Sequence, residues 1–372
     1  MSLAEWTETE RDGLFDAEAP APHPFVQLLD ADGRVTPLGQ TVGIDIELAQ
    51  RLYVDMAMAR RFDQECLALQ RQGELNLWLQ SSGQEAAQVG SIRALRPTDM
   101  VFPSYREHAV ALCRGITNVE MLRMWRGVSH SGWNPATYHF QMYSVVLGTQ
   151  TLHATGYAAG IAMDGTDEIA VAYFGDGAAS EGDVSEALNW AAAASLPVLF
   201  ICQNNQWAIS TPTSTQMRTS LHARAAGFGL DAYHVDGNDA LAVHAVTRHA
   251  ARRVRGGKGP ALIEAQTYRI GGHSTSDDPT RYRNDADVAL WMARDPLTRI
   301  ERMLRREGIP DEFFAELAER AAAFAATLRD DCRGLAGGDL DEVFAHVYAE
   351  PHTGLEVERE AYRRLRAEAE GA

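Results

Sequence analysis

Cysteines are scarce in this chain, with four among its 372 residues: Cys66, Cys113, Cys202 and Cys332. None belongs to a C-x-x-C pair, which argues against a disulfide framework and against a zinc site. This usage fits a reduced compartment, so we expect a cytoplasmic protein. Long apolar runs are also absent, because no stretch approaches the roughly 20 residues that a membrane span needs. The acidic N-terminus resembles neither a secretory signal nor an Arg-rich transit peptide.

Positive charge is in short supply as well. The 34 Lys and Arg residues face 51 Asp and Glu residues, which gives a net charge of −17. The acidic residues are spread along the chain and are not gathered in one tail. This distribution argues against a nucleic-acid groove and against an anionic membrane surface, so we expect neither as a partner. Solubility is the simplest explanation of the acidity, although local positive groups would still allow a small acidic ligand.

The composition divides the chain into three segments. Residues 1–45 are rich in Pro, Asp and Gly, which predicts an extended N-terminal arm. Residues 46–295 alternate apolar runs with helical patterns and form the predicted central domain. Residues 296–372 are rich in Ala, Glu, Arg and Leu at helical spacing, which predicts a helical C-terminal region without strands. With 45% hydrophobic residues, the chain can bury a large core.

Three apolar runs in the central segment predict buried strands. They cover residues 168–174, 197–203 and 260–268, and they are apolar nearly throughout instead of alternating. This pattern is typical of parallel strands that are covered on both faces. Helical patterns occupy residues 45–72 and 181–195. Strands that alternate with helices in this way indicate an α/β fold, a doubly wound parallel sheet with helices on both faces.

Two polar motifs follow successive strands of this predicted sheet. Gly-Asp-Gly (175–177) ends the first apolar run, and Asn-Asn (204–205) ends the second. Because ligands of such sheets bind at the carboxyl ends of the strands, we expect these motifs to lie side by side. Asp176 and Asn205 offer oxygen ligands that suit Mg²⁺, and glycines let backbone N–H groups approach an anion. A helix that begins near Glu181 would add its positive end, so the motifs predict a site for Mg²⁺ and a diphosphate.

Other interpretations of Gly-Asp-Gly fit the sequence less well. A Rossmann dinucleotide site needs G-x-G-x-x-G, and "GDGAASEG" lacks the third glycine at the required position. A nucleoside triphosphatase needs G-x-x-x-x-G-K-[ST], which does not occur in the chain. An ordinary strand-to-helix turn with a capping Asp176 is the remaining structural interpretation, and the second motif makes it less favoured.

The spacing of about 26 residues between the two motifs resembles the thiamine diphosphate-binding motif. Other stretches resemble the alpha subunit of 2-oxo acid dehydrogenases, most closely the decarboxylating component of the branched-chain type. These stretches are "YREHA" (105–109), "NNQWAISTPTS" (204–214), "VDGNDALAV" (235–243) and "YRIGGHSTSDDPTRYR" (268–283). The resemblance covers roughly residues 45–350.

This resemblance implies roles for individual residues. Asp176, Asn205 and the backbone carbonyl of Trp207 would hold Mg²⁺. His273 would be the active-site histidine, since it titrates in a range that allows proton transfer. The residues that would contact thiamine diphosphate are Tyr105, Arg106, Leu147, Gly177, Ala178, Gln203 and His273. The positions that correspond to a K⁺ site of some relatives are Ser144, Val146, Thr149 and Gln150.

Some positions depart from the family pattern. Gln203 stands where some branched-chain relatives have an Arg that contacts the diphosphate. Pro103-Ser104 precede Tyr105 where some relatives carry a Gln beside the substrate, and Gly272 replaces a second histidine that some of them have. Ser274 lies in a loop that a kinase phosphorylates in some relatives, and a phosphate there would repel the bound diphosphate. The departures leave the identity of the substrate open.

The resemblance also implies an activity and partners. The expected reaction is oxidative decarboxylation of a branched-chain 2-oxo acid, with transfer of the acyl group to the lipoyl group of an acyltransferase component. The glutamate that activates the cofactor comes from a beta subunit in this family, so we expect an α2β2 heterotetramer. An alpha subunit of a pyruvate or acetoin-type dehydrogenase is the alternative. Intact motif residues disfavour a non-catalytic assembly module, and the missing glycine disfavours a nucleotide-dependent oxidoreductase.

Overall fold

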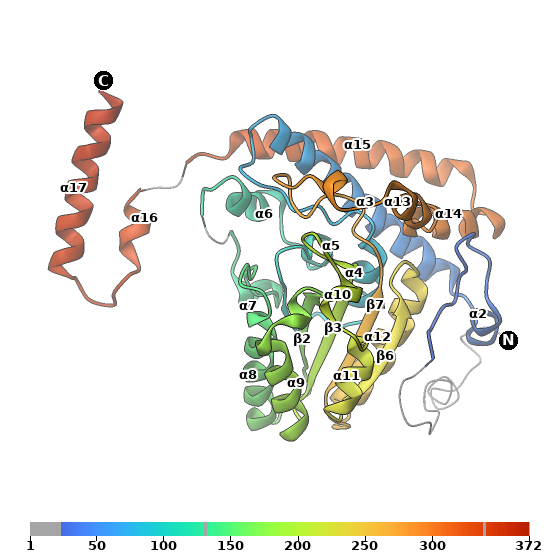
Figure 1. The fold of residues 1–372 in the computed structure, drawn as a ribbon. Coiled ribbons are helices and arrows are strands. Elements are labelled where there is room, and N and C mark those ends of the chain that lie inside the picture. The colour runs from blue at the N-terminus through green and yellow to red at the C-terminus, as the bar shows by residue number, and fades with distance from the viewer. Residues whose placement is uncertain (1–23, 130–131, 338–339, 372) are drawn as a thin grey trace.

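The computed structural model of the chain describes residues 24–129, 132–337 and 340–371. Its centre is a sheet of five parallel strands in the order β1-β2-β3-β7-β6 (Figure 1). The strands are β1 (Met100–Phe102), β2 (Ala170–Gly175), β3 (Val198–Asn204), β6 (Asp231–Asp236) and β7 (Ala261–Gln266). The predicted α/β fold is confirmed, and the three predicted strands are β2, β3 and β7.

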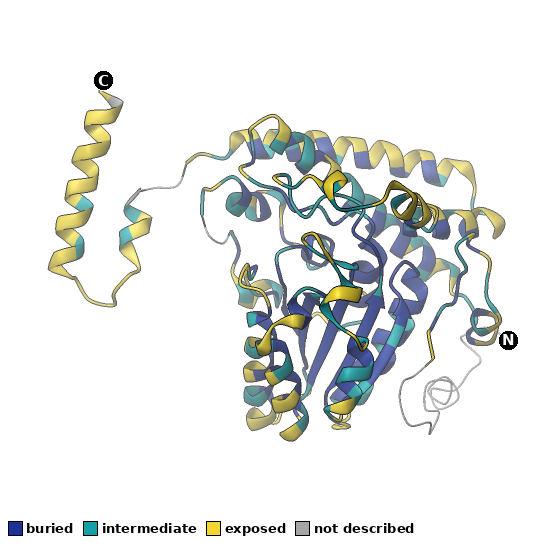
Figure 2. Cartoon of the chain, in the orientation of Figure 1, coloured by how far each residue is buried: buried dark blue, intermediate teal, exposed yellow. Residues whose placement is uncertain are grey.

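Helices cover both faces of the sheet, so the strands are buried (Figures 1 and 2). On one face lie α8 (Thr149–Asp164), α9 (Gly182–Ala193) and α11 (Leu221–Gly227). On the other lie α3 (Ile46–Arg71), α4 (Glu85–Ile92), α5 (His108–Cys113) and α12 (Ala240–Arg255). Along β2, Val171 and Tyr173 join one apolar cluster, and Ala172 and Phe174 join the other. Both faces are therefore apolar, which explains why the strand lacks an alternating pattern.

The helix predicted over residues 45–72 is α3. Asp45 caps its start, because the Asp45 side chain accepts a hydrogen bond from the Leu48 N–H at 2.9 Å. The helix ends before Gly73, whose φ of +80° continues the chain in a left-handed conformation that other residues rarely adopt. Local capping signals thus set both ends of the longest helix on this face.

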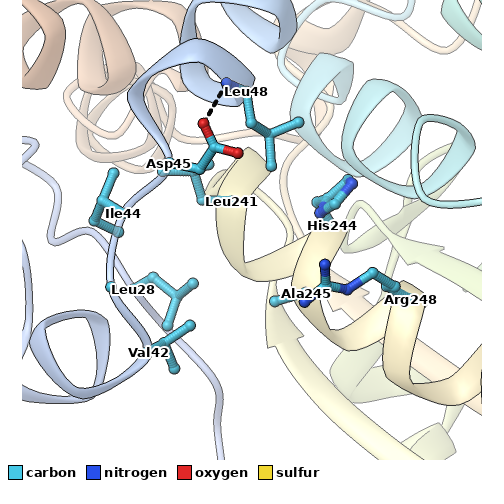
Figure 3. Close-up of a pocket in the computed structure, with 10 residues that line it drawn as sticks. Leu28, Val42, Ile44, Asp45, Leu48, Leu241, His244, Ala245 and Arg248 are labelled. Carbon is cyan, nitrogen blue, oxygen red and sulfur yellow. Dashed lines mark hydrogen bonds between the residues drawn. The ribbon is translucent and has the colours of Figure 1, made fainter. Parts of the chain in front are cut away.

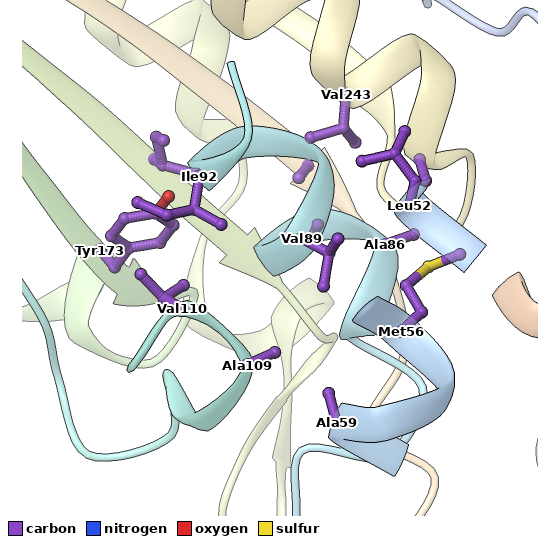
Figure 4. Close-up of a cluster of buried hydrophobic side chains, with 14 of the residues drawn as sticks. Leu52, Met56, Ala59, Ala86, Val89, Ile92, Ala109, Val110, Tyr173 and Val243 are labelled. Atoms are coloured by element: carbon purple, nitrogen blue, oxygen red, sulfur yellow. The ribbon is translucent and has the colours of Figure 1, made fainter. Parts of the chain in front are cut away.

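Helix α4 is buried along its whole length between α3 and α12. Figure 4 shows Ala86 and Val89 of α4 facing Met56 and Ala59 of α3 across this layer. The helices approach closely because α4 carries small residues: a Cβ at Gly90 would lie 2.7 Å from the carbonyl oxygen of Ala240. This tight layer anchors the strand-to-helix loops that face the candidate site.

The C-terminal region is helical in the part that the structure describes, as predicted. Helices α14 (Pro296–Arg306) and α15 (Asp311–Gly334) pack on α3, whereas α16 (Leu340–Ala345) and α17 (Thr353–Glu370) extend away from the body (Figure 1). The remaining elements are α2 (Pro37–Val42), α6 (Asn118–Trp125), α7 (Pro135–Tyr138), η1 (Ala178–Ser180), β4 (Trp207–Ala208), β5 (Thr211–Pro212), α10 (Thr213–Gln216), η2 (Pro279–Arg281) and α13 (Asp285–Met292). Within the described residues, no helix is long and apolar enough to cross a membrane. The three segment boundaries stay a prediction.

Most of the predicted N-terminal arm, residues 1–23, lies outside the described residues. Its remainder is not extended throughout, because Val26 pairs with Val235 of β6 in a parallel bridge but residues 37–42 form helix α2. The buried carboxylate of Asp239 fixes this segment, since its Oδ2 accepts hydrogen bonds from the N–H groups of Leu28 and Leu29 at 2.7 and 2.6 Å. Its Oδ1 accepts two more from the first turn of α12, at 3.1 Å each. One side chain thus caps α12 and attaches the N-terminal segment to it.

We expect Asp239→Ala to lower the free energy of unfolding by about 3 kcal/mol, because four backbone N–H groups lose their acceptor in a buried place. Urea denaturation of the purified chain measures the change. Asp330→Ala is the control, since Asp330 is an exposed carboxylate on α15 and its removal should change stability by less than about 0.5 kcal/mol. Equal losses in both variants would contradict the role of Asp239.

Candidate active site

The carboxyl ends of β2 and β3 open into a cavity of about 720 Å³. The strands pair in parallel with Gly175 opposite Gln203, so the two polar motifs leave the sheet at the same edge. Ten residues singled out from the sequence line this cavity: Asp176, Asn205, Trp207, Tyr105, Arg106, Leu147, Gly177, Ala178, Gln203 and His273. The loops that carry them come from five separate parts of the chain, and the sheet edge brings them together.

Asp176 is almost fully buried, and its two carboxylate oxygens differ. Oδ2 accepts hydrogen bonds from Thr213 Oγ1 at 2.8 Å and from Gln216 Nε2 at 3.0 Å. Oδ1 has no hydrogen-bond partner among the described residues. Burial raises the pKa of the Asp176 carboxyl, and the bonds from Thr213 and Gln216 only partly offset that effect. A buried oxygen without a partner is costly, so it marks a place where a cation would be favourable.

Asn205 and Trp207 add two further oxygens at the same edge. The Asn205 side chain donates to Gln84 Oε1 at 3.2 Å and accepts from the Trp207 N–H at 3.3 Å. The Trp207 carbonyl accepts from Arg269 Nη1 at 3.2 Å. The described residues contain no group of three or more His, Cys, Asp or Glu side chains placed to hold a metal. The candidate ligands are instead one carboxylate, one amide and one carbonyl, a set that suits a hard cation such as Mg²⁺.

The turn after β2 leaves no room for a side chain at Gly177. A Cβ there would lie 2.9 Å from the Cβ of Ala208, so the backbone approaches the opposite loop closely. Ala178 follows in the short helix η1, and α9 begins only at Gly182. The helix start expected near Glu181 is therefore correct, with a 3₁₀ turn inserted before it. Backbone N–H groups in such a turn can approach an anion directly.

Arg106 lies buried at the wall of the cavity. Its guanidinium donates to the carbonyl of Gln80 and, at 2.8 Å, to the carbonyl of His273. These bonds connect three loops around the cavity, so Arg106 positions His273 as well as placing a positive charge there. The two carbonyls occupy only some of the N–H donors of the Arg106 guanidinium, so the others are available to bind a phosphate.

The imidazole of His273 is half-buried between cations. Burial, together with the charges of Arg106 and Arg269, lowers the pKa of His273 to about 4. The ring lies edge-on to Tyr105, with 6.1 Å between the ring centroids. His273 is therefore neutral near pH 7 in this structure, and an anion bound beside it would raise its pKa.

Gln203 connects the cavity to a buried polar network that the sequence did not reveal. Its Nε2 donates to Glu107 Oε1 at 2.6 Å, and its Oε1 accepts from Gln88 Nε2 at 2.9 Å. Burial raises the pKa of Glu107 to about 7. Of the two N–H groups of the Gln203 amide, one is thus committed to Glu107, and the other is left for a ligand. Glu107 lies within the stretch "YREHA", but no sequence pattern indicated its bond to Gln203.

The residues predicted for K⁺ lie apart from this cavity. Ser144 and Gln150 line a separate cavity of about 390 Å³, and the carbonyl of Val146 accepts hydrogen bonds from Ser144 Oγ and the Thr149 N–H. Gln150 Oε1 is buried and has no partner among the described residues. The four residues therefore lie close together along the chain, but the Val146 carbonyl, one of the candidate K⁺ ligands, already accepts hydrogen bonds.

Two other features lie near or beyond the site. Ser274 lines the main cavity beside His273, so a group attached to it would lie at the cavity wall. A smaller cavity of about 250 Å³ lies between residues 42–48 and α12, with His244 and Arg248 at its wall (Figure 3). It contains none of the residues predicted for the site.

Comparison with known proteins adds independent findings. The family model described as "Dehydrogenase E1 component" matches residues 53–323. The chain is 46% identical over 343 residues to the alpha subunit of 3-methyl-2-oxobutanoate dehydrogenase from Mycobacterium tuberculosis (strain ATCC 25618 / H37Rv), covering 91% of this chain and 93% of that protein. It is 37% identical to 2-oxoisovalerate dehydrogenase subunit alpha 2, mitochondrial, from Arabidopsis thaliana, covering 89% and 73%. It is also 37% identical to the pyruvate dehydrogenase E1 component subunit alpha of Staphylococcus aureus (strain Mu50), covering 80% and 82%.

The low pKa of His273 predicts a specific pH dependence. We expect its imidazole to titrate near pH 4 in the folded chain, against about 6.5 when unfolded. Between these values the unfolded chain binds a proton that folded His273 does not, so stability falls as the pH drops through this window. NMR of the labelled imidazoles, with His273→Gln for assignment, measures the midpoint.

The same variant provides the stability control. Between pH 6.5 and 4.5, His273→Gln should lose less free energy of unfolding than the wild type. Part of the loss should remain in the variant, because burial also lowers the pKa values of His108 and His244 to about 4. A midpoint near 6.5 for His273 would show that burial and the neighbouring cations do not act as described.

Proposed function

Since the chain belongs to the dehydrogenase E1 component family, we propose that it is the alpha subunit of a branched-chain 2-oxo acid dehydrogenase. The observation that carries the proposal is the unpartnered Oδ1 of Asp176, buried at the edge of a cavity that has room for a cofactor. The branched-chain assignment is supported by the 46% identity to the mycobacterial alpha subunit, against 37% for the staphylococcal pyruvate enzyme.

The residues present fit thiamine diphosphate and Mg²⁺. Asp176 Oδ1, the Asn205 amide oxygen and the Trp207 carbonyl would hold the cation, which would receive its other ligands from the diphosphate and water. The turn at Gly177 and Ala178 lines the cavity and would offer its backbone N–H groups to the diphosphate. Three protein oxygens are too few to satisfy Mg²⁺, so this donor set favours a cation that receives its other ligands from a diphosphate and water.

The chain's own residues would bind, orient and exchange protons. Thiamine diphosphate, held by these residues, would supply the electron sink that allows a 2-oxo acid to lose CO₂. Arg106 and the free N–H of Gln203 would orient the phosphate oxygens. Neutral His273 could accept a proton at the cavity wall and deliver it again as the imidazolium, and its pKa would rise as the diphosphate neutralises Arg106.

The chain would need a partner to complete the site. Val145, Leu147 and Ile209 are large apolar residues of the cavity that remain 57%, 40% and 54% exposed. Such a rim suits coverage by a second protein. We propose a beta subunit there, in an α2β2 heterotetramer that passes the acyl group to a lipoyl-bearing acyltransferase component. A cytoplasmic location, a K⁺ ion held by the Ser144–Gln150 loop and phosphorylation of Ser274 are further parts of the proposal that rest on the family resemblance.

The first test concerns the metal site. Thiamine diphosphate with Mg²⁺ should raise the thermal midpoint of the wild-type chain, co-purified with its beta subunit, by several degrees, because both ligands bind only the folded state. Asp176→Asn should abolish that rise without lowering the midpoint of the ligand-free protein. The Asn oxygen still accepts from Thr213 and Gln216, and the variant removes a buried charge.

Asp164→Asn, at the exposed end of α8, is the matched control and should keep the full rise. A rise that survives in Asp176→Asn would remove Asp176 from the metal site.

The second test concerns the substrate. With the beta subunit, thiamine diphosphate and Mg²⁺ present, decarboxylation of 3-methyl-2-oxobutanoate should exceed that of pyruvate in kcat/KM. Asp176→Ala should reduce the rate by about 100-fold or more, since the cation loses its carboxylate ligand. A preference for pyruvate would leave the proposed fold and cofactor in place but contradict the proposed substrate. If neither acid is turned over, a non-catalytic assembly role would be favoured.

A further inference from the structure

The segment from residue 205 to residue 221 holds Asp176 in place. It leaves the sheet after β3, forms the short hairpin of β4 and β5, and returns at α11. At its centre, α10 carries Thr213 and Gln216, the two side chains that bind Oδ2 of Asp176. The orientation of the Asp176 carboxylate therefore depends on where this segment begins and ends.

Glu264 of β7 contacts both ends of the segment. Its Oε1 accepts a hydrogen bond from Asn204 Nδ2 at 2.7 Å, at the end of β3. Its Oε2 accepts from the backbone N–H and from Nδ1 of His222, at 2.9 and 2.6 Å, in the first turn of α11. The register of the sheet places Glu264 opposite Cys202 on β3, so one side chain reaches both ends.

A continuous set of contacts connects Glu264 to Asp176. Asn204 Oδ1 lies 3.2 Å from Thr213 Oγ1, the same hydroxyl that lies 2.8 Å from Asp176 Oδ2. The Thr213 hydroxyl has one hydrogen, and the nearer carboxylate oxygen of Asp176 attracts it more strongly. Asn204 therefore serves mainly to position Thr213 and bonds to it only weakly. Glu264 and Asn204 are both buried, and water does not compete for these contacts.

Glu264 is suited to this role because it is ionised. Burial raises its pKa, but the bonds from His222 and Asn204 outweigh burial and lower the pKa. An ionised carboxylate only accepts hydrogen bonds, which matches the three donors around it. The ring of His222 is also fixed from its other side, because it stacks on His234 with 4.4 Å between centroids and 13° between the planes.

We propose that Glu264 is a positioning residue of the metal site, which fixes both ends of the segment 205–221 so that Asp176 presents Oδ1 to the cation. The inference rests on the proposed function, since it takes Asp176 as a ligand of Mg²⁺. Glu264 itself contacts neither the cavity nor any of the candidate ligands. It acts through Asn204, His222 and the side chains of α10.

Glu264→Gln tests the role with little change in volume. A glutamine has one oxygen and one NH₂ group, so its NH₂ group would face either Asn204 Nδ2 or the two donors of His222. Two donors cannot bond to each other, so one end of the segment must lose its contact. His222→Phe is a milder variant, because the backbone N–H still bonds to Glu264 and the ring can still stack on His234.

The measurement is Mn²⁺ binding, followed by the electron paramagnetic resonance signal of the free ion. The full chain with its beta subunit and saturating thiamine diphosphate is titrated with Mn²⁺, which substitutes for Mg²⁺. We expect Glu264→Gln to raise the dissociation constant for Mn²⁺ about tenfold or more, and His222→Phe to raise it less. The kcat of both variants should approach that of the wild type when the metal ion is in excess.

Asp99→Asn is the matched control. Asp99 is a buried carboxylate paired with Arg255 at the opposite edge of the sheet, where β1 begins, so its loss should lower stability and leave Mn²⁺ binding unchanged. Wild-type affinity in both Glu264→Gln and His222→Phe would overturn the inference, and so would an equal loss of affinity in Asp99→Asn. If the wild type itself binds no Mn²⁺ with thiamine diphosphate, the proposed function fails first.

Discussion

The register between β2 and β3 is the constraint on which the candidate site depends. Gly175 lies opposite Gln203, so the chain leaves both strands at the same level and places Asp176 beside Asn205. A shift of one residue would send one motif to the opposite face of the sheet. Such a shift is prevented by the two apolar clusters, because each strand buries alternate residues in both of them. The hydrophobic core therefore determines the geometry of the polar site, although the polar site contributes little to the stability of the fold.

The polar groups of the site fall into two classes. Gln203 bonds to both Glu107 and Gln88 beneath the cavity, so these three side chains hold one another in place. Asp176 Oδ1 and Gln84 Nε2 are buried without a partner among the described residues, and both residues line the cavity. Unpartnered groups destabilise a folded protein, so they persist where a ligand satisfies them. The side chains beneath the cavity are hydrogen-bonded to one another, whereas Asp176 and Gln84 each have an unpartnered atom. The unpartnered atoms indicate the side of the cavity on which a ligand binds.

The sequence revealed those features that depend on neighbours along the chain. β2, β3 and β7 were predictable because both of their faces are buried, whereas β1 has only three residues and β6 is an edge strand that places the polar residues Asp231 and His234 at half-buried positions. Asp176 and Asn205 were found because each directly follows a strand. Thr213 and Glu264 were missed because their partners lie 37 and 60 residues away, and no local pattern records such contacts. Only the topology of the sheet brings them together.

The bonds of Asp239 also have a consequence for how the protein is made. The N–H group of Leu28 bonds to a carboxylate 211 residues further along the chain. At a synthesis rate of about 5–20 residues per second, that carboxylate leaves the ribosome roughly 10–40 s after Leu28 does. During this interval the N-terminal segment has no docking place, and the apolar residues Val26, Leu28 and Leu29 remain uncovered. The N-terminal segment can therefore dock only after β6 and α12 have emerged.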